Sequence, residues 1–209
     1  MASALDEQLK ALRGGLTTRY YAGIGSRETP EEMIPVIFSI ADDLGKRGYV
    51  LRSGAAAGAD TFFEQAVDSK DHPSDIWVPW RGFGGKHSEV MLPVRKHFDL
   101  ASLIHPVWNK LKPSVQGLHA RNVGQILGMD FDVDHVSACI SKTQTPCPQD
   151  SWSEFVVCWT KDKAQSHLEV TSRTGGTGTA IKLASNLGIP VFNLADETAK
   201  ARLKQYIER

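Results

Sequence analysis

The sequence predicts an α/β protein: a Rossmann-like, doubly wound parallel sheet in the strand order 3-2-1-4-5, with helices on both faces. Apolar segments typical of strands alternate with segments typical of helices from residue 19 onward, and this alternation favours parallel pairing. The third predicted strand, at residues 76–79, shows no polar alternation, as expected where both faces of a sheet are covered. The long connection after it predicts that the winding direction reverses between the first and fourth strands.

The chain is expected to begin with a short amphipathic helix at residues 1–15, followed by the first strand at residues 19–24. Thr29 is the expected N-cap of the next helix, because its hydroxyl can accept a hydrogen bond from a first-turn N–H, and Pro30 suits the first helical position. Apolar residues at helical spacing predict the buried face of this helix: Met33, Ile37, Ile40 and Leu44.

Gly48 is expected to end this helix, and residues 49–52 are expected to form the second strand. A turn of small residues at 53–58 then leads into a helix at about 60–68. The third strand follows this helix, which completes a strand–helix–strand unit of the parallel type.

Residues 81–153 are expected to form a helical and irregular insertion within a single domain that spans residues 1–209. Helices are predicted near residues 87–103 and 115–128, and an irregular segment that contains Pro and Cys at residues 129–153. So long a stretch without strands is unusual in a compact domain and generally carries function.

Residues 155–159 are typical of a fourth strand, and a Gly-rich loop at residues 175–179 leads into a helix that ends near residue 187. Residues 189–194 and 196–208 then provide the fifth strand and the last helix. Doubly wound sheets bind ligands at the carboxyl ends of the strands beside the reversal. The two Gly-rich loops that follow the first and fourth strands are therefore predicted to meet at one ligand site.

Composition and charge exclude several classes of protein. Of the 209 residues, 41% are apolar, and 24 basic side chains balance 24 acidic ones, which is an ordinary globular balance. A net charge of zero counts against binding nucleic acid mainly through bulk positive charge, and it mildly favours a homo-oligomer, with a dimer expected. No apolar run reaches the roughly 18 residues of a membrane span, and no secretory signal is visible, so a cytoplasmic protein is expected.

The three cysteines, Cys139, Cys147 and Cys158, form no C-x-x-C pair. Their number and spacing predict neither a disulfide framework nor a zinc site. The histidines show no metal-ligand spacing either. We therefore expect no metal and no tightly held cofactor.

The loop at Gly23–Arg27 (GIGSR) is a candidate anion site because it follows a strand and precedes a helix. Glycine lets backbone N–H groups approach a phosphate, Ser26 can donate a hydrogen bond, and Arg27 can make a bidentate contact. The alternative is a plain strand-to-helix turn with an exposed arginine. The loop is not a dinucleotide fingerprint, because the G-x-G-x-x-G pattern fails at Glu28, and the sequence contains no Walker lysine.

The loop at Gly175–Thr179 (GGTGT) is the stronger anion signal. Glycines, hydroxyls and a new helix N-terminus together favour a nest for a phosphate or carboxylate. The alternative is a flexible loop with a threonine N-cap.

Asp60 and Glu64 are the candidate catalytic carboxylates, and they follow the turn that contains Ser53 and Gly54. Asp60 could hydrogen-bond a ribose, and Glu64 lies one helical turn further along the same face. The alternative is structural: residues 61–64 (TFFE) match a capping box, with Asp60 just before it.

Two further segments suit a nucleotide. Arg121 and Asn122, beside His119, could contact a phosphate or a base, and the alternative is a solvated helix face. The loop at residues 80–86 (WRGFGGK) interleaves aromatic and basic groups, which suits a base and its phosphate. This loop could equally be a lid that makes no direct contact.

These segments occur in the order GIGSRETP, RSGAAAGADTFFEQA, HARNVGQILG, FVVCWT, GGTGTAIKLASNLGIPVFNL. In this order they resemble the SLOG superfamily of Rossmann-like proteins, which contains the DNA recombination mediator DprA, the YpsA-like proteins and the LOG-type phosphoribohydrolases. The single-domain DprA-like and YpsA-like proteins of phages and bacteria are the most similar in character.

The resemblance implies a nucleotide-type ligand. It places the following residues around the phosphate or beside it: Gly23, Gly25, Ser26, Arg27, Ser53, Gly54, Arg121, Asn122, Gly175, Gly176, Thr177, Gly178 and Thr179. The chain departs from the LOG-type hydrolases where they carry a glutamate soon after their GG-x-GT motif, because residues 180–183 here are AIKL. N-glycosidic cleavage needs a carboxylate beside a cationic sugar, so that activity would require Asp60 or Glu64 to substitute.

Two functions of different classes follow from these residues. The favoured one is a nucleotide-binding protein that holds a nucleotide-derived ligand or a single-stranded DNA end at the carboxyl edge of the sheet. The alternative is an N-glycosidase, phosphoribohydrolase or deoxyribosyltransferase that acts on a nucleoside 5′-monophosphate, with Asp60 or Glu64 as its carboxylate.

Overall fold

The structure is a computed structural model that describes residues 18–141, 147 and 149–209. The helix predicted at residues 1–15 lies outside the described residues. Within the described part of the chain, no helix combines the length and apolarity that crossing a membrane requires.

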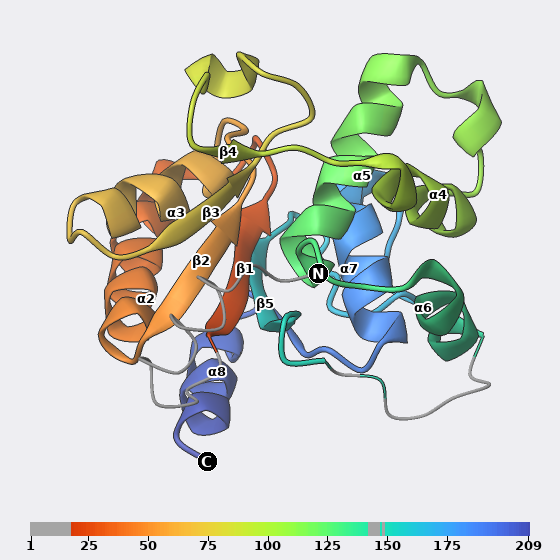
Figure 1. Cartoon of the computed structure of the whole chain (residues 1–209). Coiled ribbons are helices and arrows are strands. Elements are labelled where there is room, and N and C mark those ends of the chain that lie inside the picture. Colours follow the sequence, from red (N-terminus) through yellow and green to blue (C-terminus); the bar gives the residue numbers. More distant parts are fainter. Residues whose placement is uncertain (1–17, 142–146, 148) are drawn as a thin grey trace, which may run out of the picture.

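Six strands form one parallel sheet in the order β4-β3-β2-β1-β5-β6 (Figure 1). The strands are β1 (Arg19–Gly25), β2 (Tyr49–Ser53), β3 (Ser74–Trp77), β4 (Val90–Met91), β5 (Ser153–Trp159) and β6 (Val191–Asn193). The predicted fold class and the predicted order of five strands are therefore confirmed. The sheet has one more strand than predicted, because the short edge strand β4 lies in the segment that was expected to begin a helix.

Helices cover both faces of the sheet (Figure 1). One face carries α2 (Ile34–Lys46), α3 (Ala59–Asp68) and α8 (Ala199–Ile207), and the other carries α4 (Arg95–Ile104), α5 (Pro113–Leu127), α6 (Val133–Ile140) and α7 (Gly178–Asn186). Each set of helices buries its own apolar core against the sheet. The described residues also form four short 3₁₀ helices: η1 (Glu31–Met33), η2 (Phe83–Gly85), η3 (Trp108–Lys110) and η4 (Ser172–Thr177).

The N-cap predicted at Thr29 and the capping box considered at residues 61–64 are wrong, whereas the helix predicted at about residues 60–68 is confirmed as α3. Thr29 does not cap a helix, because its hydroxyl donates to the Ser26 carbonyl at 2.6 Å and α2 begins only at Ile34, after η1. The capping box predicted at residues 61–64 does not form. The Thr61 hydroxyl donates to the Ala56 carbonyl at 2.8 Å, and α3 begins at Ala59. In both places a loop carbonyl competes with the helix end for the hydroxyl.

The segment expected to be irregular, residues 129–153, contains helix α6. The Asp132 carboxylate accepts a hydrogen bond from the His135 N–H at 2.7 Å and so caps the helix N-terminus. A disulfide joins Cys139 to Cys147, with their Cα atoms 6.2 Å apart. This bond contradicts the expectation that the cysteines form no disulfide. The spacing of eight residues does not by itself indicate a disulfide, and the two side chains meet only because α6 carries Cys139 towards Cys147.

Gly23 lies in β1 under α3, and its position leaves no room for a side chain. A Cβ atom there would lie 2.6 Å from Leu51 Cδ1 and 2.7 Å from Phe63 Cγ, and both of these side chains are fully buried. We predict that Gly23→Ala lowers the free energy of unfolding by about 1–3 kcal/mol, as overpacking of a core does. Urea denaturation measures this change.

Gly176 provides the matched control, because a Cβ atom there would meet no atom within 4 Å. Gly176→Ala should change the free energy of unfolding by less than about 0.5 kcal/mol. Equal stability of the Gly23→Ala variant and the parent would show that the β1–α3 contact is looser than described.

Candidate functional site

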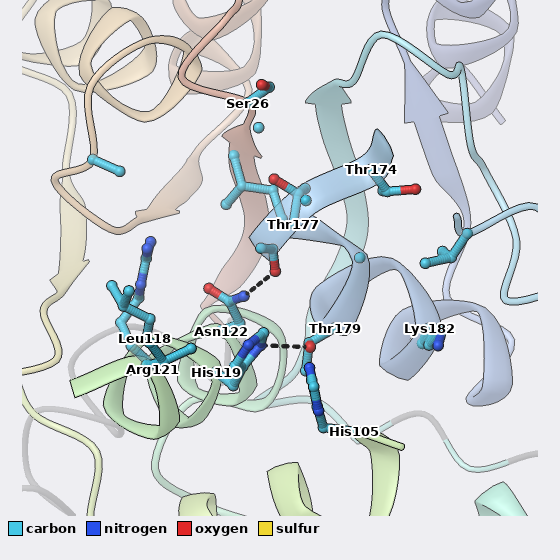
Figure 2. A pocket seen from close by; sticks show the side chains of 18 of the residues that line it. Ser26, His105, Leu118, His119, Arg121, Asn122, Thr174, Thr177, Thr179 and Lys182 are labelled. Carbon is cyan, nitrogen blue, oxygen red and sulfur yellow. Dashed lines mark hydrogen bonds between the residues drawn. The ribbon is translucent and has the colours of Figure 1, made fainter. Parts of the chain in front are cut away.

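A cavity of about 860 Å³ opens at the carboxyl edge of the sheet (Figure 2). Its walls come from the loop after β1, from α5, and from η4 with the start of α7. The structure brings together at this cavity most of the residues that the sequence singled out: Gly25, Ser26, Arg27, Asp60, Arg121, Asn122, Gly175, Gly176, Thr177, Gly178 and Thr179. The two Gly-rich loops therefore face one space.

Four predicted site residues do not line this cavity. Gly23 is packed under α3, as described above. The Ser53 hydroxyl donates to the Asp60 carbonyl at 3.3 Å. Gly54 lies directly against Arg121, because a Cβ atom at Gly54 would lie 1.5 Å from Arg121 Nη1. Glu64 accepts from the Ala55 N–H and pairs with Lys86.

An ion pair between Asp60 and Arg121 lies at the centre of the site. Asp60 Oδ2 accepts from Arg121 Nη1 at 2.8 Å, and Oδ1 accepts from the Gly25 N–H at 3.0 Å. Both side chains are buried. This pair ties α3 and α5 to the end of β1.

Gln125 and Asn122 extend this pair into a network that reaches the second loop. The Gln125 amide accepts from Arg121 Nη1 at 3.0 Å and donates to Asn122 Oδ1 at 3.1 Å. Asn122 in turn donates to the Gly176 carbonyl at 2.7 Å, a contact visible in Figure 2. The network therefore links the loop after β1 to the loop before α7. The sequence analysis did not include Gln125, although it lies one helical turn after Arg121.

Both candidate carboxylates are held by the protein itself. Burial raises the pKa of Asp60, while Arg121 and two backbone N–H groups oppose the rise. Burial also raises the pKa of Glu64. The Glu64 carboxylate accepts from the Ala55 N–H at 2.7 Å and pairs with Lys86 at 3.3 Å. Each carboxylate has structural partners, and Glu64 lies away from the cavity.

Asp162 holds the second loop in place. It accepts hydrogen bonds from the hydroxyls of Thr160 at 2.9 Å, Thr171 at 2.8 Å and Thr174. These bonds lower the pKa of Asp162. The sequence analysis missed this residue, because its partners lie up to twelve positions away and no short motif contains them.

A second feature that the sequence did not predict is the contact between two histidines, His105 at the end of α4 and His119 on α5, next to the start of α7. His119 Nδ1 lies 2.7 Å from the Thr179 hydroxyl, and the His105 ring lies 4.4 Å from the His119 ring (Figure 2). Burial, with smaller contributions from His105 and Arg121, lowers the pKa of His119 to about 4. His119 is therefore neutral at pH 7, and Lys182 supplies positive charge at this end of the cavity.

The cavity lining combines charged, polar and apolar side chains. Arg27 is exposed at the rim and forms no ion pair with any residue that the structure describes. It shares the rim with Glu28. Apolar side chains also line the cavity: Ile104, Pro106, Val107, Val115 and Leu118 come from the connection after α4 and from α5, and Val170 lies against Gly178 at the start of α7.

The aromatic and basic loop at residues 80–86 contributes no residue to this cavity. Trp80 packs edge-on against Phe83, with ring centroids 5.3 Å apart. Arg81 donates to the His87 carbonyl at 3.1 Å. The loop instead supports the site indirectly, through the contact between Lys86 and Glu64.

No protein family model matches this chain, and no curated protein matches it. Two solved structures are similar to it. One is DNA processing protein A from Helicobacter pylori, whose structure was described for its mode of binding single-stranded DNA. It is 15% identical to this chain with a TM-score of 0.42, and the match covers 91% of this chain and 73% of that one. The other is DNA processing protein A from Streptococcus pneumoniae, 13% identical with a TM-score of 0.43, covering 95% of this chain but only 58% of that one. At this distance the similarity assigns no function, so function has to be inferred from this chain's own residues.

His119 makes the stability of the fold depend on pH. Its pKa in the folded state lies below the ordinary value of 6.5, so between these values the unfolded chain binds more protons than the folded chain. Stability is therefore complete above pH 6.5 and falls as the pH drops towards 4. We predict that His119→Gln makes the free energy of unfolding fall by about 1–3 kcal/mol less between pH 7 and pH 4.5 than it does in the parent. Urea denaturation of both proteins at pH 7 and pH 4.5 measures the difference, and parallel pH profiles would contradict the prediction.

Proposed function

We propose that this chain binds a nucleotide or a nucleotide-derived ligand in the cavity at the carboxyl edge of the sheet. The observation that carries the proposal is the convergence of two Gly-rich loops on one cavity, which is also lined by Arg27, an arginine without an ion pair among the described residues, and by apolar side chains from α5 and the connection after α4. A nucleotide has the matching chemistry, with an anionic phosphate at one end and a flat apolar base at the other.

The phosphate is assigned to the end of the cavity between Arg27 and the start of α7. Gly175 and Gly176 are exposed, and a Cβ atom at either would meet nothing within 4 Å, so an anion can approach the backbone there. The N-terminus of α7 adds the positive end of a helix dipole. Arg27 can then close on the phosphate as a bidentate donor.

The base is assigned to the apolar wall formed by the connection after α4 and by α5. Val107 is 46% exposed, and with Leu118 it offers apolar surface to a ring. A cavity of about 860 Å³ falls within the range of roughly 300–1,000 Å³ that is usual for small-ligand sites. The volume is therefore sufficient for a mononucleotide.

The geometry supports binding over catalysis through the two candidate carboxylates. A glycosidase needs a carboxylate that faces the sugar. Asp60 gives both oxygens to Arg121 and Gly25, and Glu64 faces Ala55 and Lys86 away from the cavity. We therefore propose nucleotide binding and not N-glycosidic cleavage. The motifs of this chain also suggest a relationship to the SLOG superfamily.

Isothermal titration calorimetry with nucleoside 5′-monophosphates and the matching nucleosides tests the proposal. We predict that the monophosphates bind, that the nucleosides bind much more weakly, and that Arg27→Ala weakens monophosphate binding by about 10- to 100-fold. A hydrogen bond to a charged group is worth about 1.5–3 kcal/mol, or about 10- to 150-fold in affinity, which includes that range.

Arg47→Ala is the matched control, because Arg47 is an exposed arginine beyond the C-terminus of α2, where it pairs with Asp43. The proposal fails if no monophosphate binds, or if the Arg27 and Arg47 variants bind equally well. Short oligonucleotides with and without a 5′-phosphate form a second arm. A single-stranded DNA end as the ligand predicts tighter binding of oligonucleotides than of monophosphates and a steep loss of affinity with salt.

The same samples test the alternative function. We predict that prolonged incubation with nucleoside 5′-monophosphates releases no free base, as measured by reversed-phase chromatography, because neither candidate carboxylate faces the cavity freely. Release of base by the parent and its loss in Asp60→Asn or Glu64→Gln would instead support the N-glycosidase.

A further inference from the structure

A cluster of metal-ligating side chains lies in the α6 region, separate from the cavity. His135 Nε2, Cys139 Sγ and Cys147 Sγ all lie within 4.8 Å of one another. None of the three residues lines the nucleotide cavity. Figure 1 shows α6 at the outer side of the helical layer, beyond α7.

The backbone places these three donors together. His135 and Cys139 are four residues apart on α6, so they share one face of the helix. The Asp132 cap fixes the turn that carries His135. Cys147 returns to the same face from the connection before β5, where the structure joins it to Cys139 as a disulfide.

The spacing between His135 and Cys139 suits two ligands of a tetrahedral metal ion, whereas the two sulfurs are bonded to each other in the disulfide and would have to separate on reduction. His135 Nε2 lies 3.8 Å from Cys139 Sγ. Two ligands of one zinc ion, with bonds of about 2.3 Å to sulfur and about 2.0–2.1 Å to nitrogen, lie about 3.6 Å apart. Both cysteines are buried, at 4% and 6% exposure, in the apolar core that packs against α7. Their thiolates would therefore be shielded from bulk solvent.

We propose that the reduced protein binds one Zn²⁺ through His135, Cys139 and Cys147, with water in the fourth position. Two thiolates and an imidazole form a soft, mixed donor set, and such a set binds Zn²⁺ in preference to Mg²⁺ or Ca²⁺. The metal site and the disulfide are alternative states of one cysteine pair. Either state ties the connection before β5 to α6.

The exchange between the two states balances. A dithiol reductant gives two electrons to the Cys139–Cys147 bond and is itself oxidised to a disulfide, which leaves two protein thiols. Each thiol loses a proton to solvent as its sulfur binds Zn²⁺, so two protons are released for each ion bound. A compartment that keeps thiols reduced favours the metal-bound state, and an oxidising one favours the disulfide.

The test uses the full chain without a polyhistidine tag, reduced under anaerobic conditions and dialysed after addition of one equivalent of Zn²⁺. Elemental analysis should find one zinc per chain in the parent. Replacing Zn²⁺ with Co²⁺ should give a thiolate-to-metal charge-transfer band. Cys139→Ser and His135→Ala should lose stoichiometric binding, and circular dichroism checks that each variant folds.

Cys158→Ala is the matched control, because Cys158 is the buried free cysteine of β5. This variant should bind as much zinc as the parent. A readout on the parent alone covers variants that fail to fold: Zn²⁺ should raise the melting temperature of the reduced protein and leave that of the oxidised protein unchanged. The proposal is overturned if the reduced parent binds no zinc, if Cys139→Ser binds as much as the parent, or if Zn²⁺ affects the oxidised and reduced proteins alike. None of these outcomes depends on nucleotide binding.

Discussion

The ion pair between Asp60 and Arg121 is the interaction on which the rest of the site depends. It joins the end of β1, the first turn of α3 and the middle of α5 at one buried point. Gln125 and Asn122 then carry the connection to the loop before α7. Breaking one partner of a buried pair leaves an uncompensated charge, which is strongly destabilising. The geometry of both Gly-rich loops is therefore coupled to this pair.

This pair also explains two of the glycines that the sequence singled out. At Gly54 a Cβ atom would occupy the space of the Arg121 guanidinium, and at Gly25 it would lie 2.7 Å from both Ala59 Cβ and the Trp159 carbonyl. These glycines are needed because helices α3 and α5 and strand β5 approach the backbone so closely. Their small size serves packing around the buried pair, whereas Gly175 and Gly176 face open space and leave a surface on which an anion can be bound.

The sequence predicts what depends on local patterns and misses what depends on distant partners. The strands of the central sheet are recognisable because they are short apolar runs, and the meeting of the two loops follows from the topology of doubly wound sheets. Asp162, His105 and Gln125 act through partners on other elements or through a network, so no motif reveals them. The edge strand β4 is too short to show a period, and α6 lies among Pro and Cys residues that indicate irregular structure.

The balance of charge sets how such a site can select its ligand. The chain has no net charge, so long-range attraction contributes little, and selection must come from groups at short range. Asp60 neutralises Arg121, and burial keeps His119 neutral, which leaves Arg27 and Lys182 as the cations at the cavity that lack an ion pair within the described residues. Arg27 and the N-terminus of α7 together can offset the charge of one phosphate group, whereas Lys182 lies near His105. A long polyanion would need further positive surface, which is why the proposed ligand is a single nucleotide or the end of a strand and not the body of a nucleic acid.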